Sequence, residues 1–309
     1  MAQRFTVFDA PNASLTYAAS INKKGDVGGY FFDASQGNRS RGYVRDSTGN
    51  FIVFDVPNAS GVEVVSINKG GDVTGSCYSP TARAFVRSQN GNFTVFDAPN
   101  AHITRGLSIN DAGDIAGVFE DASQGNKLRG FVRTPSGVIT IFDGPNAWGT
   151  QALCINERSE ITGVFQTAST GPAHGFVRKP NGNVTVFDAP NASLMYAASI
   201  NKRGDIAGYF TDTQNLTHGF LRQRGGNIIV FDGPSSSGTY GLSLNDRSTI
   251  AGNFQSDHGF VRHPNGRFTV FDAPNASITR AASINKHREI AGSFFDTTQN
   301  KNRAFVRRP

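Results

Sequence analysis

Cysteine and long apolar runs are scarce in this chain, and each absence excludes a class of protein. Two Cys among 309 residues cannot build a disulfide framework. No apolar stretch approaches the roughly 20 residues that a membrane-spanning helix needs, so we expect no membrane span. Residues 1–4 lead straight into a β-type run, and this form of the sequence shows no signal peptide.

Helical periodicity is also missing. No stretch keeps its apolar residues at helical spacing, so we predict no helix. Short β-branched and aromatic runs alternate instead with turn residues, and 35 Gly and 13 Pro suit a fold with many tight turns. The composition therefore predicts an all-β protein.

One phrase repeats along the whole chain. It reads roughly FTVFD-x-PNA, a variable patch, SIN-x-x-GDIAG-x-F, a second variable patch, and H/R-G/A-FVR. Its first aspartate recurs at steps of 40 to 46 residues, as Asp9, Asp55, Asp97, Asp143, Asp188, Asp232 and Asp272. Units of this length with several β-type runs each are typical of propellers. We predict a single domain over residues 1–309, a seven-bladed β-propeller of four-stranded antiparallel blades, with repeats starting near residues 4, 50, 92, 138, 183, 227 and 267.

The fifth unit shows how a repeat divides into strands. Its β-type runs are Val184–Phe187, Ala197–Ile200, Ile206–Phe210 and Gly219–Arg222. Small residues precede each Ser-Ile-Asn, which suits a crowded inner strand beside a central channel. The run rich in Phe and Val then becomes the outer strand. We therefore expect each blade to run from an inner to an outer strand in chain order.

The two chain ends complement each other. The chain opens on an outer-strand phrase, Phe5–Asp9, and stops at a third-strand phrase, Ala304–Arg307. We predict that the N-terminal strand completes the last blade by antiparallel pairing. Such closure of the ring removes exposed sheet edges.

Residues that occur in every unit favour structural roles. The seven aspartates precede Pro-containing turns, where an Asp side chain commonly accepts a backbone hydrogen bond from two residues on. The asparagines that open the tight hairpins are interpreted in the same way: Asn22, Asn68, Asn110, Asn156, Asn201, Asn245 and Asn285. Cys77 replaces a Phe of other units and Cys154 replaces a Ser, so both are interpreted as packing residues.

A basic residue begins each third strand: Arg41, Arg83, Arg129, His174, His218, His258 and Arg303. Arg cannot ligate a metal, so its exchange with His argues against zinc. A hydrogen bond or ion pair to a neighbouring turn acid fits better. We predict no metal site and no cofactor.

The net charge of +6 is unevenly distributed. The face that carries the Ser-Ile-Asn hairpins has an excess of basic residues, and the opposite face has an excess of acidic ones. The arginine that ends each third strand feeds this basic face: Arg45, Arg87, Arg133, Arg178, Arg222, Arg262 and Arg307. Such a field can steer an acidic polymer to the protein, or simply keep a glycine-rich chain in solution.

One position differs between the repeats although its neighbours are nearly uniform. It lies eight residues after each aspartate and holds Tyr17, Glu63, Arg105, Gln151, Tyr196, Tyr240 and Arg280. These residues start the inner strands, so we expect them to ring the channel mouth on the acidic face. Mixed aromatic and hydrogen-bonding groups are typical of ligand sites, and Trp148 lies in the same loop of the fourth unit. Drift at a solvent-exposed position explains the variation equally well.

The phrases His-Gly-Phe or Arg-Ala-Phe, together with Ser-Ile-Asn-x-x-Gly-Asp-Ile-Ala-Gly, resemble the bacterial extracellular repeat family named for its His-Ala-Phe signature (HAF repeats). The resemblance covers all seven units, but this chain uses Gly more often than Ala and Arg in four of the seven His positions. It implies an exported bacterial β-propeller, secreted from the cell, and transfers no site residues.

Three functions follow from these patterns. The first is a non-catalytic binding or scaffold propeller, for a glycan, a protein or another extracellular ligand at the channel mouth, and we expect a monomer. The second is a lyase or hydrolase that uses the funnel, with Glu63 and the ring tyrosines as the only candidates for acid–base chemistry. The third is binding of an anionic polymer on the basic face. Nucleic acid is disfavoured, because aromatic residues do not interleave with the basic ones as stacking platforms require.

Overall fold

The computed structural model describes residues 4–234, 238–254 and 257–309. Within them β-strands alternate with turns, which confirms the predicted all-β class. Two single-turn 3₁₀ helices, η1 (Ala34–Gln36) and η2 (Ala122–Gln124), correct the prediction that no helix occurs. The side chain of Asp33 or Asp121 caps each of them by accepting a hydrogen bond from the backbone N–H two residues on. In the described residues no helix is long and apolar enough to span a membrane.

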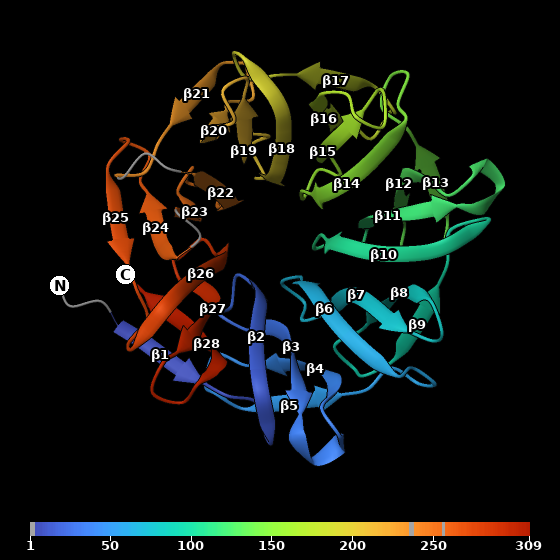
Figure 1. Ribbon diagram of the computed structural model, residues 1–309. Coiled ribbons are helices and arrows are strands. Elements are labelled where there is room, and N and C mark those ends of the chain that lie inside the picture. Colours follow the sequence, from blue (N-terminus) through green and yellow to red (C-terminus); the bar gives the residue numbers. More distant parts are fainter. Residues whose placement is uncertain (1–3, 235–237, 255–256) are drawn as a thin grey trace.

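Four-stranded antiparallel groups surround a common axis, the arrangement of a β-propeller (Figure 1). We call each group a blade. Five blades are separate sheets, whereas β14–β17 and β18–β21 join into one eight-stranded sheet through a single parallel bridge between Ala173 and Leu194. The chain order within a blade, from inner to outer strand, is the predicted one.

The strands occupy four positions in the blades. The inner strands are β2 (Ala13–Ile21), β6 (Gly61–Ile67), β10 (Ala101–Ile109), β14 (Gly149–Ile155), β18 (Ala192–Ile200), β22 (Thr239–Leu244) and β26 (Ala276–Ile284). The second strands are β3 (Val27–Asp33), β7 (Val73–Tyr78), β11 (Ile115–Asp121), β15 (Ile161–Gln166), β19 (Ile206–Asp212), β23 (Ile250–Phe254) and β27 (Ile290–Asp296). The third strands are β4 (Arg39–Arg45), β8 (Ala82–Arg87), β12 (Lys127–Arg133), β16 (Ala173–Arg178), β20 (Thr217–Arg222), β24 (His258–Arg262) and β28 (Lys301–Arg308). The outer strands are β5 (Phe51–Phe54), β9 (Phe93–Phe96), β13 (Ile139–Phe142), β17 (Val184–Phe187), β21 (Ile228–Phe231), β25 (Phe268–Phe271) and β1 (Arg4–Phe8).

The two ends of the chain lie in one sheet. Strand β1 pairs antiparallel with β28, and the register sets Arg4 opposite Arg308 and Phe8 opposite Ala304. The first strand therefore occupies the outer position in the sheet that holds β26 to β28, and β1 and β28 belong to the same blade in Figure 1.

The H/R-G/A-FVR motif of the third strand contributes the core of each blade. Its Phe, replaced by Tyr43 in the first unit, is fully buried, as at Phe220. The preceding glycine leaves room for a ring of the outer strand: a Cβ on Gly219 would lie 2.2 Å from the Phe231 ring. Ala takes this place at Ala84 and Ala304.

Each inner strand contains a β-bulge that the sequence analysis did not foresee. The register against the second strand shifts just before the repeated Ser, for example between Ala18 and Ser20. In β2 the bulge leaves Ala19 unpaired, and in β10 it leaves Leu107 unpaired, which bends each strand locally.

Candidate functional site

The backbone around the variable position is fixed by residues that recur in the blades. In five of the seven repeats the preceding residue is a buried Thr, and in each of these its hydroxyl accepts the N–H of the residue after the aspartate, as Thr16 does from Ala10. On the second strand, the Gly of Ile-Ala-Gly faces the carbonyl oxygen of the variable residue, and a Cβ on Gly208 would lie 2.0 Å from the Tyr196 oxygen. The scaffold is therefore uniform, and only the side chain at this position differs between blades.

We call the seven variable residues the ring. They are Tyr17, Glu63, Arg105, Gln151, Tyr196, Tyr240 and Arg280, and each lies on an inner strand. Arg105 and Arg280 are exposed and the other five are half-buried. All therefore retain surface that a ligand can reach.

Two ring residues line a cavity of about 390 Å³ between the inner strands β2 and β26. Tyr17 stacks on Tyr30 with ring centroids 5.1 Å apart, and its hydroxyl accepts a hydrogen bond from Asn302 at 3.1 Å. Arg280 and Ser293 contribute to the same wall. The cavity thus combines an aromatic surface, amide and hydroxyl groups, and one guanidinium.

Two further ring residues line a smaller cavity of about 130 Å³ between β14 and β18. Gln151 and Tyr196 share it with Trp148, whose side chain is 52% exposed. Tyr196 stacks on Tyr209 at 4.9 Å, and Tyr209 makes an edge contact with Tyr240 at 4.9 Å. An aromatic surface therefore continues from this cavity onto the next blade.

Glu63 lies in a cluster of tyrosines. Its carboxylate accepts a hydrogen bond from the Tyr78 hydroxyl at 3.0 Å. Burial and the charge of Glu63 raise the pKa of Tyr30 to about 12, so this phenol remains protonated at neutral pH. Burial likewise raises the pKa of Tyr209 to about 12. Four ring residues thus line the two cavities, whereas Glu63, Arg105 and Tyr240 line neither of them.

The opposite end of the channel carries a network that the sequence predicted only in part. Each hairpin Asn accepts backbone N–H bonds of its own turn, as Asn201 does from Arg203 and Asp205, which confirms the predicted turn role. Each also donates its amide to the carbonyl oxygen of the corresponding Asn of the next blade, at 3.0 to 3.2 Å. Because Asn285 donates to Asn22, this sequence of bonds returns to its start.

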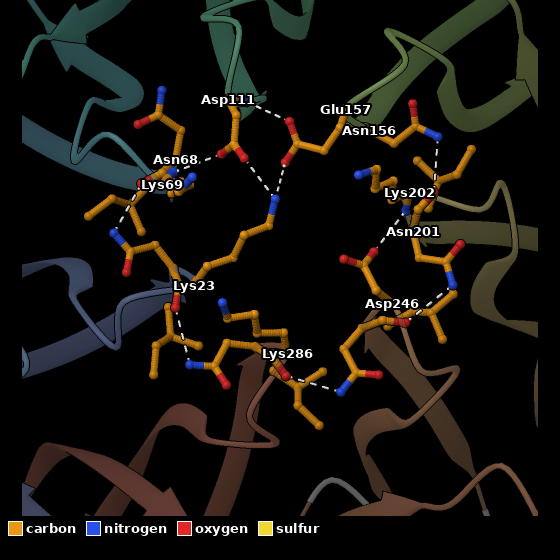
Figure 2. A pocket seen from close by; sticks show the side chains of 18 of the residues that line it. Lys23, Asn68, Lys69, Asp111, Asn156, Glu157, Asn201, Lys202, Asp246 and Lys286 are labelled. Carbon is orange, nitrogen blue, oxygen red and sulfur yellow. Dashed lines mark hydrogen bonds and ion pairs between the residues drawn. The ribbon is translucent and has the colours of Figure 1, made fainter.

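The residue after each Asn lines the mouth at this end, a cavity of about 160 Å³ (Figure 2). Lys23 extends across it and its amino group contacts Asp111 at 2.7 Å and Glu157 at 2.8 Å. Burial lowers the pKa of Lys23, but the two carboxylates outweigh burial and raise it above its ordinary value. Lys23 is therefore charged, and it closes part of this mouth. Sequence analysis missed it because the lysine partners lie on other blades.

Within the part of the chain that the structure describes, the seven repeated aspartates do not accept the backbone hydrogen bonds that the sequence predicted for them. Their carboxylates pair with the basic residue that starts the third strand, as Asp55 does with Arg41 at 2.9 Å and Asp232 with His218 at 2.8 Å. The predicted hydrogen bond or ion pair of the basic residues to a turn acid is thus confirmed, and the predicted backbone cap by Asp is wrong. The turn is held instead by its own backbone, for example by the bond from Ala13 to Ala10.

The arginines assigned to the basic face are buried, which corrects that assignment. Their side chains are only 7–9% exposed, and each guanidinium lies 4.6 to 5.0 Å from a Phe ring of the preceding blade: Arg45, Arg87, Arg133, Arg178, Arg222, Arg262 and Arg307. Burial lowers the pKa of Arg222. These cations join blades and contribute little to a surface field.

The cysteines fit their structural interpretation. Both are free, and burial raises the pKa of each thiol, so neither is an activated nucleophile. Cys154 lies at the position where Ser side chains accept an N–H bond from the next blade, as Ser108 does from Ile155. Among the described residues no group of three or more His, Cys, Asp or Glu side chains can hold a metal ion.

Solved structures of similar shape support the fold. Streptogramin B lyase has a TM-score of 0.66 and 15% identity, covering 98% of this chain and 97% of that chain. A catalytically inactive virginiamycin B lyase from Staphylococcus aureus, solved with quinupristin, has a TM-score of 0.70 and 14% identity over 100% of both chains. A polysaccharide lyase has a TM-score of 0.53 and 9% identity over 98% of each chain. Such identities establish only the fold, which is that of a β-propeller.

No protein-family model and no curated protein matches the chain. The resemblance to the HAF repeats therefore stays a prediction from the quoted phrases.

Proposed function

We propose that this protein is a non-catalytic, seven-bladed β-propeller that binds an extracellular glycan at the ring. The seven-blade count and the closure by the N-terminal strand belong to this proposal. They are supported by the pairing of β1 with β28 and by the asparagine bonds that return from Asn285 to Asn22. Secretion is proposed on the HAF resemblance alone.

Stacked tyrosines beside cavities with free polar groups carry the proposal. The Tyr17–Tyr30 and Tyr196–Tyr209 pairs border cavities that also hold Asn302, Gln151 or Trp148. A sugar ring presents a flat apolar face and a rim of hydroxyls, which such a surface matches. Large amphipathic rings give contact area at little entropic cost.

The alternatives find less support in the geometry. A catalytic tyrosine base needs a pKa near the working pH, but burial raises the pKa of the ring residue Tyr196 above its ordinary value of about 10. Binding of an anionic polymer on the basic face is less well supported, because the repeated arginines stack on Phe rings inside the fold and are not available to a ligand.

A double variant, Tyr196→Ala with Tyr240→Ala, tests the proposal. A glycan is first identified on an array of neutral and acidic glycans. The double variant should bind this glycan with an affinity at least about tenfold lower, because the contact surface of both tyrosine side chains is removed. Val138→Ala serves as control, since this side chain is 61% exposed on a loop outside the ring. Unchanged binding by the double variant would refute the ring as the site. Turnover of the bound glycan that is lost in Glu63→Gln would instead establish an enzyme.

A further inference from the structure

The cavity between β2 and β26 differs from the rest of the ring in its charge. Arg280 is exposed at its wall, and its guanidinium has no hydrogen-bond or ion-pair partner among the residues that the structure describes. No Asp or Glu is among the described residues that line the cavity. Glu63, whose charge acts on Tyr30, is engaged by Tyr78 instead. The guanidinium is therefore available to an anion from outside.

The polar groups around Arg280 have capacity left for a ligand. The Tyr17 hydroxyl accepts a bond from Asn302, so its own proton is free to be donated. The amide oxygen of Asn302 is available to accept a hydrogen bond from a ligand hydroxyl. Ser293 is already used, because its hydroxyl accepts the backbone N–H of Ala18 at 3.0 Å. One donor and one acceptor thus flank an aromatic wall.

Size and geometry narrow the class of ligand. A volume of about 390 Å³ is in the range of small-molecule sites and is lined by Tyr17, Tyr30, Phe294 and Phe295. Arginine offers a planar pair of donors that matches the two oxygens of a carboxylate. A hexuronate residue combines a carboxylate, ring hydroxyls and an apolar ring face.

We propose that this cavity is a subsite for a uronic acid residue, with Arg280 binding its carboxylate and Tyr17 and Asn302 binding its hydroxyls. This inference rests on the proposed glycan-binding function and deepens it. The cavity at Gln151 and Tyr196, which has no charged residue among its described lining, would take a neutral sugar of the same chain.

Paired ligands test the assignment. Calorimetric titration would compare an oligouronate with the same oligosaccharide after reduction of its carboxyl groups, using the full chain. Wild-type protein should bind the oligouronate at least about tenfold more tightly, as expected for a charge-assisted bidentate pair. Arg280→Gln should abolish that preference, and Arg280→Lys should restore it only in part.

The controls separate failure of this inference from failure of the proposed function. Arg247→Gln removes an exposed arginine at the opposite end of an inner strand and should leave both affinities unchanged. Circular dichroism and the melting temperature verify that each variant is folded. An equal affinity for both ligands, a preference that persists in Arg280→Gln, or binding only to sulfated sugars would overturn the uronate subsite while leaving glycan binding in place. Absence of binding to every glycan would overturn both.

Discussion

At the residue scale, the repeated phrase is explained by contacts between blades and strands rather than by chemistry. The Gly of Ile-Ala-Gly lets the backbone of the variable residue approach the second strand, and the last Arg of the phrase stacks on a Phe of the preceding blade. The Asp of each blade contacts the Arg or His of the same blade, through an ion pair with Arg or a hydrogen bond with His. Residues that recur are thereby assigned to the scaffold, and the ring is left as the place where blades differ.

Gly208→Ala should destabilise the fold, because the new Cβ would lie 2.0 Å from the carbonyl oxygen of Tyr196, a backbone atom that cannot swing aside. We expect a loss of about 1–3 kcal/mol in the free energy of unfolding, measured by urea denaturation. Gly225→Ala is the matched control, since nothing lies within 4 Å of its Cβ. Equal stability of the two variants would contradict the close approach.

His218 should make stability depend on pH. Burial lowers the pKa of His218, but its bonds to Asp232 and Asp212 outweigh burial and raise it above the ordinary value of about 6.5. The protonated form is therefore favoured in the folded state, and its stabilisation is complete below about pH 6.5 and lost as pH rises through the folded pKa. The pKa of Asp212 is lowered, first by the Leu216 N–H, so its contribution stays constant in this range.

Melting temperatures between pH 6 and pH 8 check this prediction. The wild type should lose more stability over the range than His218→Gln does. A parallel pH dependence of both proteins would show that the pair contributes nothing.

At the element scale, the hairpin after each inner strand both turns the chain and connects blades. Asn245 shows the two roles separately, because Thr249 replaces the acid that other hairpins carry at this place. Its side-chain oxygen accepts the N–H groups of Arg247 and Thr249, while its amide donates to the Asn285 carbonyl at 3.0 Å. Both groups are buried, so each bond contributes to stability.

Asn245→Asp should keep the turn and lose the bond between blades, because a carboxylate accepts but cannot donate. We expect a loss of about 1–3 kcal/mol in the free energy of unfolding, since the buried Asn285 carbonyl is left without this donor. Asn245→Ala, which loses both roles, should be less stable still. If Asn245→Asp were as stable as the wild type, the connection between blades would not matter energetically.

The order of the strands within a blade and the strand positions of the fifth repeat could be predicted from the sequence, because turn residues and β-type runs are local signals. Outer strand Val184–Phe187 agrees with β17, and the inner run Ala197–Ile200 is the end of the longer β18. The buried position of Arg222 and the reach of Lys23 to Asp111 were not predictable, since both depend on how one blade faces others. The cavities beside Tyr17 and Tyr196 could not be predicted either, because they lie between neighbouring blades.

At the scale of the whole molecule, the fold depends on a strand from the far end of the chain. Phe8 of β1 is buried against Tyr43, and the Arg45 guanidinium lies 4.6 Å from its ring. Strand β1 thus covers the edge of β28 and also contacts the blade β2–β5.

Removal of residues 1–8 should expose the edge of β28 and cause loss of stability and self-association, seen as a lower melting temperature and larger species in size-exclusion chromatography. A peptide of residues 1–12 added in trans should restore the elution volume of the full chain, whereas a scrambled peptide should not. A truncated protein that elutes like the full chain and has an unchanged melting temperature would contradict the role of β1.

The most direct test of glycan binding at the ring is a glycan array probed with the wild type and the Tyr196→Ala/Tyr240→Ala variant at low and physiological salt. We predict binding to a defined set of sugars that survives physiological salt and is lost in the variant, with fluorescence of Trp148, the single Trp, changing on titration. Binding that collapses with salt and is equal in both proteins would contradict this account and indicate an electrostatic surface instead.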